Sequence, residues 1–189
     1  MKKSFLFLLL LFVTSCISVE LSGYNSGYKK LSSEEKSKVT VLADDVAISS
    51  LTNSDTVYQI TASQLNDFLK QEDSVMIYFW SPHCPGESCY PISTVQEFSN
   101  KKGYSLIVVC DYFDFEAMNA QKSSALAYPM LAINTAFYKT NRCWKYQQRF
   151  RADLFNTEVK ELEHGKLYSR YLLFNRGALA KTFSDPMAK

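Results

Sequence analysis

Two cysteines, Cys84 and Cys89, lie in the segment FWSPHCPGESCYP, which covers residues 79–91. The segment follows a continuous apolar run over residues 75–80, which is typical of a strand buried on both faces. Pro91 suits the first turn of a helix. A cysteine between a strand end and a helix start lies near free backbone N–H groups, which stabilise a thiolate. The pattern therefore predicts a thiol pair able to exchange disulfides.

The spacing of the two cysteines limits their geometry. Residues five apart on a regular helix point about 140° apart, so their sulfurs could not meet there. A Cys84–Cys89 disulfide therefore requires Pro85 and Gly86 to lie in a loop, or the first helical turn to unfold. A helix start at Pro91 favours the loop.

The flanking elements predict an α/β fold. Strand patterns cover residues 57–60, 106–110 and 171–183, the last with a turn at 175–177, and residues 128–133 form a short apolar stretch. Helix patterns follow a capping box at Thr61–Gln64 and cover residues 115–127. Another helix presents Cys143, Tyr146, Phe150 and Leu154 on one face. Cys110 and Cys143 are predicted to be core residues, and a disulfide between them is left open. This order predicts a mixed sheet flanked by helices.

The cysteine segment resembles the thioredoxin superfamily, most closely its membrane-anchored TlpA-like branch, over roughly residues 57–183. That branch ends a strand in Phe-Trp-Ala-x-Trp-Cys-x-x-Cys, and Phe79, Trp80, Ser81 and Cys84 follow this pattern, with His83 in place of the second Trp. Residues 128–131 and 171–177 resemble its Tyr/Phe-Pro-x-Leu strand and its hairpin. The resemblance implies a thioredoxin-like central mixed sheet with a helical insertion over residues 134–165.

The same resemblance implies a thiol–disulfide oxidoreductase that needs no cofactor. Cys84 is expected to be the nucleophile and Cys89 the resolving cysteine, although the reverse order stays open. A protonated His83 would add to the positive field, and the alternative is an exposed loop side chain. The superfamily has a cis-proline before the hairpin strand, where this chain has Ser169 and Arg170.

The Cys-x4-Cys spacing and the missing proline leave three other functions open. The first is a redox-inactive adaptor module in which Cys84–Cys89 is a structural disulfide. The second is a peroxiredoxin-like peroxidase, whose Thr-Pro-x-Cys-x-x-Glu-x-Cys pattern has its glutamate at Glu87 and its distant arginine at Arg170. The third is a Sco-like copper chaperone, with Cys84, Cys89 and His164 as the metal ligands.

Residues 1–16 resemble a bacterial lipoprotein leader. Lys2 and Lys3 precede a short apolar run, and Val13-Thr-Ser-Cys16 resembles a lipobox. That run is too short to span a bilayer, which needs about 20 apolar residues. The resemblance implies a signal peptide over residues 1–15, acyl chains such as palmitate on Cys16, and a lipid-anchored protein of the bacterial cell envelope. It would face the periplasm or the cell surface, on the outer membrane if the cell is Gram-negative.

The remaining chain divides into a flexible tether over residues 16–55 and a domain over residues 56–189. The sequence has 21 Lys and Arg and 19 Asp and Glu, and two of the lysines lie in the predicted leader. This balance argues against a nucleic-acid partner. The expected partners are the membrane, through Cys16, and protein thiols or disulfides of the envelope.

Overall fold

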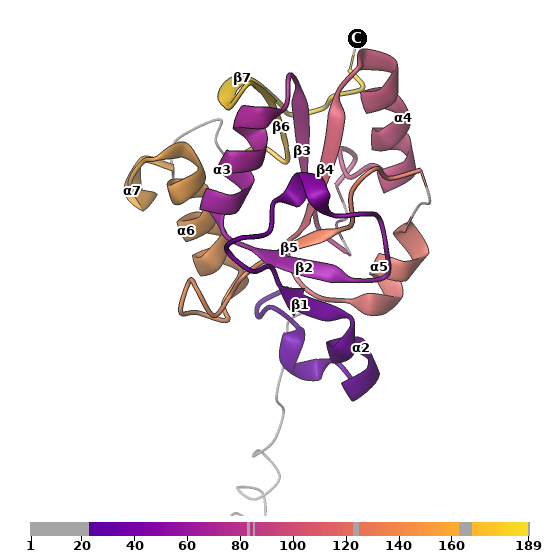
Figure 1. Ribbon diagram of the computed structural model, residues 1–189, viewed down its shortest axis with the longest axis vertical. Helices are drawn as coiled ribbons and strands as arrows, with labels where there is room; N and C mark the ends of the chain where they lie inside the picture. Colours follow the sequence, from indigo (N-terminus) through magenta and orange to yellow (C-terminus); the bar gives the residue numbers. More distant parts are fainter. Residues whose placement is uncertain (1–22, 83, 85, 123–124, 163–167, 189) are drawn as a thin grey trace, which may run out of the picture.

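The computed structural model describes residues 23–82, 84, 86–122, 125–162 and 168–188 (Figure 1). Its elements, in chain order, are η1 (Tyr28–Lys30), α2 (Ser33–Ser37), β1 (Val39–Val41), η2 (Ile48–Ser50), β2 (Val57–Ile60), α3 (Ala62–Gln71), β3 (Val75–Trp80), α4 (Ile92–Lys102), β4 (Ser105–Cys110), α5 (Phe115–Gln121), β5 (Leu131–Ile133), α6 (Cys143–Phe155), α7 (Val159–Leu162), β6 (Tyr171–Asn175) and β7 (Ala178–Phe183).

The described strands form one mixed sheet of seven strands in the order β1-β2-β5-β4-β3-β6-β7. The first five strands of this order pair in parallel, and β6 and β7 run antiparallel as a C-terminal hairpin. Strand β3 lies between β4 and β6, well inside the sheet. A mixed α/β fold with flanking helices is therefore confirmed, as is the closing hairpin.

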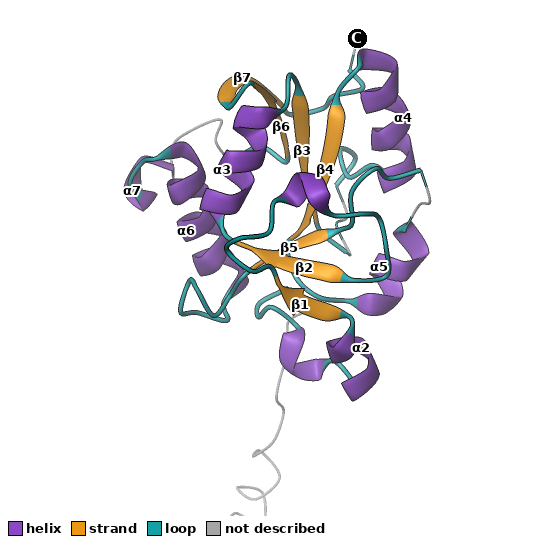
Figure 2. Cartoon of the chain, viewed as in Figure 1, coloured by secondary structure: helices purple, strands orange, loops and turns teal. Residues whose placement is uncertain are grey.

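Two helical layers cover the sheet (Figure 2). Helices α3 and α6 pack their apolar residues on one face, with Ile77 and Phe79 of β3. Helices α4 and α5 pack on the other face, with Tyr78 and Trp80. All six residues of β3 are buried, as expected for a strand covered on both sides. Alternating residues of β3 thus enter two separate cores.

Local sequence signals account for most element boundaries. Thr61 and Gln64 form the predicted capping box at the start of α3. The predicted face of α6 is confirmed, because Cys143, Tyr146, Phe150 and Leu154 are all buried. Helix α5 ends at Gln121, so it is shorter than the helix expected over residues 115–127. Pro129 disfavours helical geometry at residue 128, so a helix cannot easily extend up to this proline.

The expected flexible tether is wrong for residues 23–55. Strand β1 pairs in parallel with β2, its neighbour in the sheet. Leu31, Leu42 and Ile48 are buried in the two cores. These apolar side chains are too widely spaced to show a helical or strand period, so their burial was not evident from the sequence.

The predicted leader and Cys16 lie outside the described residues. Among the residues that are described, no helix is both long enough and apolar enough to cross a membrane.

Gly27 offers a test of how firmly the N-terminal segment docks. Its φ is +76°, and a Cβ there would lie 2.3 Å from the backbone oxygen of Phe113. Gly103 has a similar φ of +72° but nothing within 4 Å of such an atom. We expect Gly103→Ala to lower the free energy of unfolding by roughly 1 kcal/mol, from backbone strain alone. Gly27→Ala should cost roughly 1–3 kcal/mol more, because overpacking adds to the same strain.

Urea unfolding of the two variants measures this difference. Equal costs would show that Gly27 does not contact Phe113 in the folded protein.

Candidate functional site

Cys84 and Cys89 form a disulfide in the loop between β3 and α4, with Cα atoms 6.0 Å apart. Both residues are partly exposed. The described residues of the loop adopt turns and bends, and α4 begins only at Ile92, with Pro91 as its N-cap. The predicted loop geometry is therefore confirmed. The bond lies at the carboxyl end of a central strand, where the sheet presents loop residues to solvent.

Two buried tyrosines bind the loop from the core side through their hydroxyl groups. The Tyr171 hydroxyl donates to the carbonyl of Ser88 at 2.6 Å, and the Tyr78 hydroxyl donates to the carbonyl of Tyr90 at 2.8 Å. Their rings stack with centroids 4.6 Å apart. Burial raises the pKa of Tyr78 far above its ordinary value, so its hydroxyl keeps its proton and remains a donor. The two hydrogen bonds fix the backbone on both sides of Cys89.

Helix α4 presents a favourable electrostatic end to the cysteines. Its first turn contains no acidic residue, and the side chain of its N-cap, Pro91, accepts no capping hydrogen bond. The backbone N–H of Ile92 donates to Gln121 Oε1 of α5 at 3.1 Å. Helix α4 begins at Ile92, three residues after Cys89, and the positive end of a helix stabilises a nearby thiolate.

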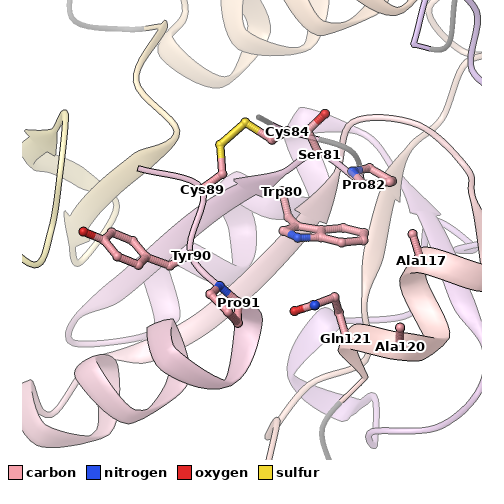
Figure 3. Close-up of a pocket in the computed structure, with 10 residues that line it drawn as sticks. All are labelled: Trp80, Ser81, Pro82, Cys84, Cys89, Tyr90, Pro91, Ala117, Ala120 and Gln121. Atoms are coloured by element: carbon pink, nitrogen blue, oxygen red, sulfur yellow. A yellow bond between two sulfur atoms is a disulfide. The ribbon is translucent and has the colours of Figure 1, made fainter. Parts of the chain in front are cut away.

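A pocket of about 310 Å³ opens beside the disulfide (Figure 3). Its walls are Trp80, Ser81, Pro82, Cys84, Cys89, Tyr90, Pro91, Ala117, Ala120 and Gln121. The Trp80 indole lies between the sulfur atoms and the α5 residues, whereas the Tyr90 ring points away from it (Figure 3). The Tyr90 hydroxyl instead donates to the carboxylate of Asp185 at 3.0 Å. The pocket is a mainly apolar surface that reaches both sulfurs.

A cluster of charged side chains lies on the opposite side of β3, where Arg151 is buried and Asp111 and Arg170 are partly exposed. Arg170 Nη1 lies 3.7 Å from Asp111 Oδ2, and also donates to the carbonyl of Phe79 at 3.3 Å. The Arg151 guanidinium lies 3.7 Å from the centroid of the Phe79 ring, and its Nη1 donates to the carbonyl of Ser169. This cluster ties β3, β4, α6 and the start of β6 together at one edge of the sheet.

Burial dominates the charge balance of this cluster. It raises the pKa of Asp111 to about 6, although Arg170, Arg151 and the Ser81 hydroxyl all favour the ionised form. Burial also lowers the pKa of Arg151 to about 10, which leaves it charged at neutral pH. Asp111 Oδ1 is buried without a hydrogen-bond partner among the described atoms. Two arginines therefore only partly offset the cost of burying one carboxylate.

The structure brings together most of the residues that the sequence singled out. Trp80, Ser81, Cys84 and Cys89 line the same pocket. Ser169 and Arg170 lie beside β3, where the N–H of Phe79 donates to the carbonyl of Arg170 at 2.9 Å. Glu87 belongs to the loop but is exposed and outside the pocket lining.

Three predicted side chains cannot be placed. His83, His164 and Cys16 lie outside the described residues. Within the described parts of the chain, no three His, Cys, Asp or Glu side chains are grouped so that they could hold a metal ion.

The other two cysteines are core residues. Cys110 and Cys143 are free and buried, so their mutual pairing is excluded. Burial raises the pKa of Cys110 well above its usual range and that of Cys143 to about 11. Both thiols therefore stay protonated and unreactive at neutral pH.

Sequence reasoning missed Asp111, Arg151 and the two tyrosines. Asp111 follows a predicted buried strand, so its place at the carboxyl edge of the sheet could have been found. Arg151 directly follows Phe150 of the apolar face of α6, and nothing in the helical pattern indicates that an arginine there is buried. The sequence indicates that Tyr78 and Tyr171 are core residues. The carbonyls to which their hydroxyls donate come near them only when the loop has folded.

Comparisons with known proteins add no relative: no protein-family model, curated protein or solved structure matches this chain.

The Asp111 carboxyl predicts a pH dependence of stability. Its pKa is about 6 when folded and near 3.8 in an unfolded chain, so its favourable contribution is complete below pH 4 and is lost as the pH rises through 6. An asparagine cannot ionise. The free energy of unfolding of the native protein, relative to Asp111→Asn, should therefore fall by up to about 3 kcal/mol between pH 4 and pH 7.

Denaturant unfolding at several pH values gives this difference, because the other carboxylates titrate equally in both proteins. A constant difference across the range would contradict a raised pKa for Asp111.

Proposed function

We propose that this protein is a membrane-anchored, thioredoxin-like thiol–disulfide oxidoreductase that uses Cys84 and Cys89. The observation that carries the proposal is the position of the disulfide. It is partly exposed, lies at the carboxyl end of the central strand β3 and borders a mainly apolar pocket. A bond that only stapled the fold would need neither access nor an adjoining cavity.

The proposed reaction begins with the reduced pair. The Cys84 thiolate attacks one sulfur of a substrate disulfide, forms a mixed disulfide and releases one substrate thiolate. The Cys89 thiolate then attacks Cys84 Sγ, which closes the Cys84–Cys89 bond and releases the second substrate thiolate. Two electrons pass to the substrate, and the two released thiolates take up the protons that the cysteines gave to solvent. Starting from the oxidised pair, the same steps in reverse oxidise a dithiol.

The arrangement around β3 supports the thioredoxin-like part of the proposal. Strand β3 ends at the cysteines and pairs with β6, the first strand of the C-terminal hairpin. Ser169 and Arg170, which the resemblance matches to the superfamily's cis-proline position, lie at the end of that pairing. Helices α6 and α7 fall within residues 134–165, the stretch that the resemblance treats as an insertion.

The surroundings of Arg170 favour disulfide exchange over peroxide reduction. A peroxidase needs an arginine directed at the attacking sulfur. The guanidinium of Arg170 instead contacts Asp111 and the carbonyl of Phe79, on the side of β3 that faces α6.

A redox equilibrium tests the proposal. The protein is equilibrated with glutathione buffers of stepped potential, and the Cys84–Cys89 bond is quantified by alkylation and peptide mass spectrometry. A midpoint above about −250 mV is expected for a pair that exchanges with other proteins, whereas a midpoint below about −300 mV would indicate a structural disulfide.

Two variants sharpen the result. Cys84→Ser and Cys89→Ser should each abolish turnover with a disulfide substrate, because either removes one of the two sulfurs. Cys143→Ala serves as the control and should keep turnover, since that thiol is buried in the other core. Peroxide consumption that is lost in Cys84→Ser would favour the peroxidase instead.

A further inference from the structure

One end of the domain carries exposed aromatic rings among basic side chains. Tyr24, Phe137 and Trp144 are 46%, 57% and 49% exposed, although large apolar side chains usually avoid such exposure. Lys139 and Arg142 are exposed and Lys145 is partly exposed. These six residues are called the aromatic–basic face below.

Backbone contacts join the two segments that build this face. Asn25 and Arg142 form an antiparallel bridge, and the N–H of Cys143 donates to the carbonyl of Tyr24 at 3.1 Å. The Arg142 guanidinium lies 5.8 Å from the centroid of the Tyr24 ring, and Lys145 Nζ lies 5.2 Å from that of Trp144. Tyr24 and Arg142 therefore lie together at the start of α6, next to Trp144 and Lys145 in its first turn. Phe137 and Lys139 lie in the loop that leads into this helix.

Charge is strongly segregated on these segments. Residues 134–150 contain Lys139, Arg142, Lys145 and Arg149 and no acidic residue, in a chain whose charges otherwise nearly balance. Residues 23–31 add Lys29 and Lys30 without an acidic residue, and the first acidic residues after them are Glu34 and Glu35 of α2. Such a surface attracts a large anionic partner.

The chain reaches the domain at this same face. Gly23 is the first described residue and precedes Tyr24, and Figure 1 shows the chain joining the end of the molecule that carries β1 and the loop before α6. Six residues lie between Cys16 and Gly23, so seven Cα–Cα steps join them, and even a fully extended chain of that length spans at most about 25 Å. A domain of this size is roughly 40 Å across. A lipid on Cys16 would therefore keep the aromatic–basic face close to the bilayer.

We propose that the aromatic–basic face lies against an anionic lipid surface and fixes the orientation of the domain on its membrane. Aromatic rings with a polar edge and long basic side chains are the residue types that settle at a membrane–water interface. Anionic headgroups attract juxtamembrane Lys and Arg. This inference rests on the lipid anchor of the proposed function but does not depend on the chemistry of the cysteines.

Tryptophan fluorescence of the full lipidated chain in vesicles tests this orientation. The vesicles contain phosphatidylglycerol and brominated phosphatidylcholine, whose acyl-chain bromines quench only rings at the bilayer. We expect quenching in the native protein and none in Trp144→Phe, because the remaining Trp80 is buried. High salt, or vesicles of phosphatidylcholine alone, should reduce the quenching at least roughly twofold by weakening the attraction to headgroups.

A pair of charge-reversed variants provides the matched control. Lys139→Glu/Arg142→Glu/Lys145→Glu should lose at least roughly half of the quenching, through repulsion from the anionic surface. Lys101→Glu/Lys102→Glu/Lys181→Glu makes the same change in net charge and should keep the quenching. These lysines belong to α4 and β7, which reach the end of the molecule opposite β1 (Figure 1).

Flotation of the vesicles separates the two ways in which the inference can fail. Protein that floats with the vesicles but shows no quenching of Trp144 would overturn the orientation and leave the anchor intact. Protein that floats no better than Cys16→Ala would overturn the lipid anchor and the orientation with it. The redox equilibrium of Cys84 and Cys89 is independent of both outcomes.

Discussion

The position of the disulfide depends on two buried phenols, because the described residues between Trp80 and Ile92 form no helix or strand. Tyr78 and Tyr171 donate to the carbonyls on either side of Cys89. Removing a donor from a buried carbonyl costs about 1–3 kcal/mol, so the loop backbone at Cys89 resists displacement. The core thus fixes the backbone on both sides of Cys89, one of the two residues of the disulfide.

The alternation of a buried strand explains why this edge of the sheet has two different environments. Tyr78 and Trp80 face the α4 side, where they support the loop and line the pocket. Phe79 faces the α6 side, where its ring lies under the Arg151 guanidinium. A partly exposed disulfide and a charge cluster therefore lie at the end of the same strand, and Ser81 borders both of them. The cluster joins four elements, so its loss would disturb the strand that carries the loop.

Local patterns predicted much of this fold and the outline of the site. The capping box at Thr61, the buried run of β3 and the hairpin near Gly177 each depend on neighbouring residues alone, and each was found. Contacts between distant segments were not found. The docking of residues 23–55 depends on side chains such as Leu31 that meet the core only after folding, and the burial of Arg151 depends on the ring of Phe79. The sequence could place Cys84 and Cys89 in a loop but not name the phenols that hold it.

The bend between β3 and α4 is expected to stabilise a thiolate, and the pH dependence of alkylation tests this most directly. The reduced protein is labelled with iodoacetamide across a pH series, and peptide mapping assigns the rate to each cysteine. Cys84 or Cys89 should react with a pKa clearly below the value of about 8.5 for a free thiol, within the range of about 3.5–7.5 found at helix starts. Two thiols that both titrate at or above about 8.5 would contradict the account.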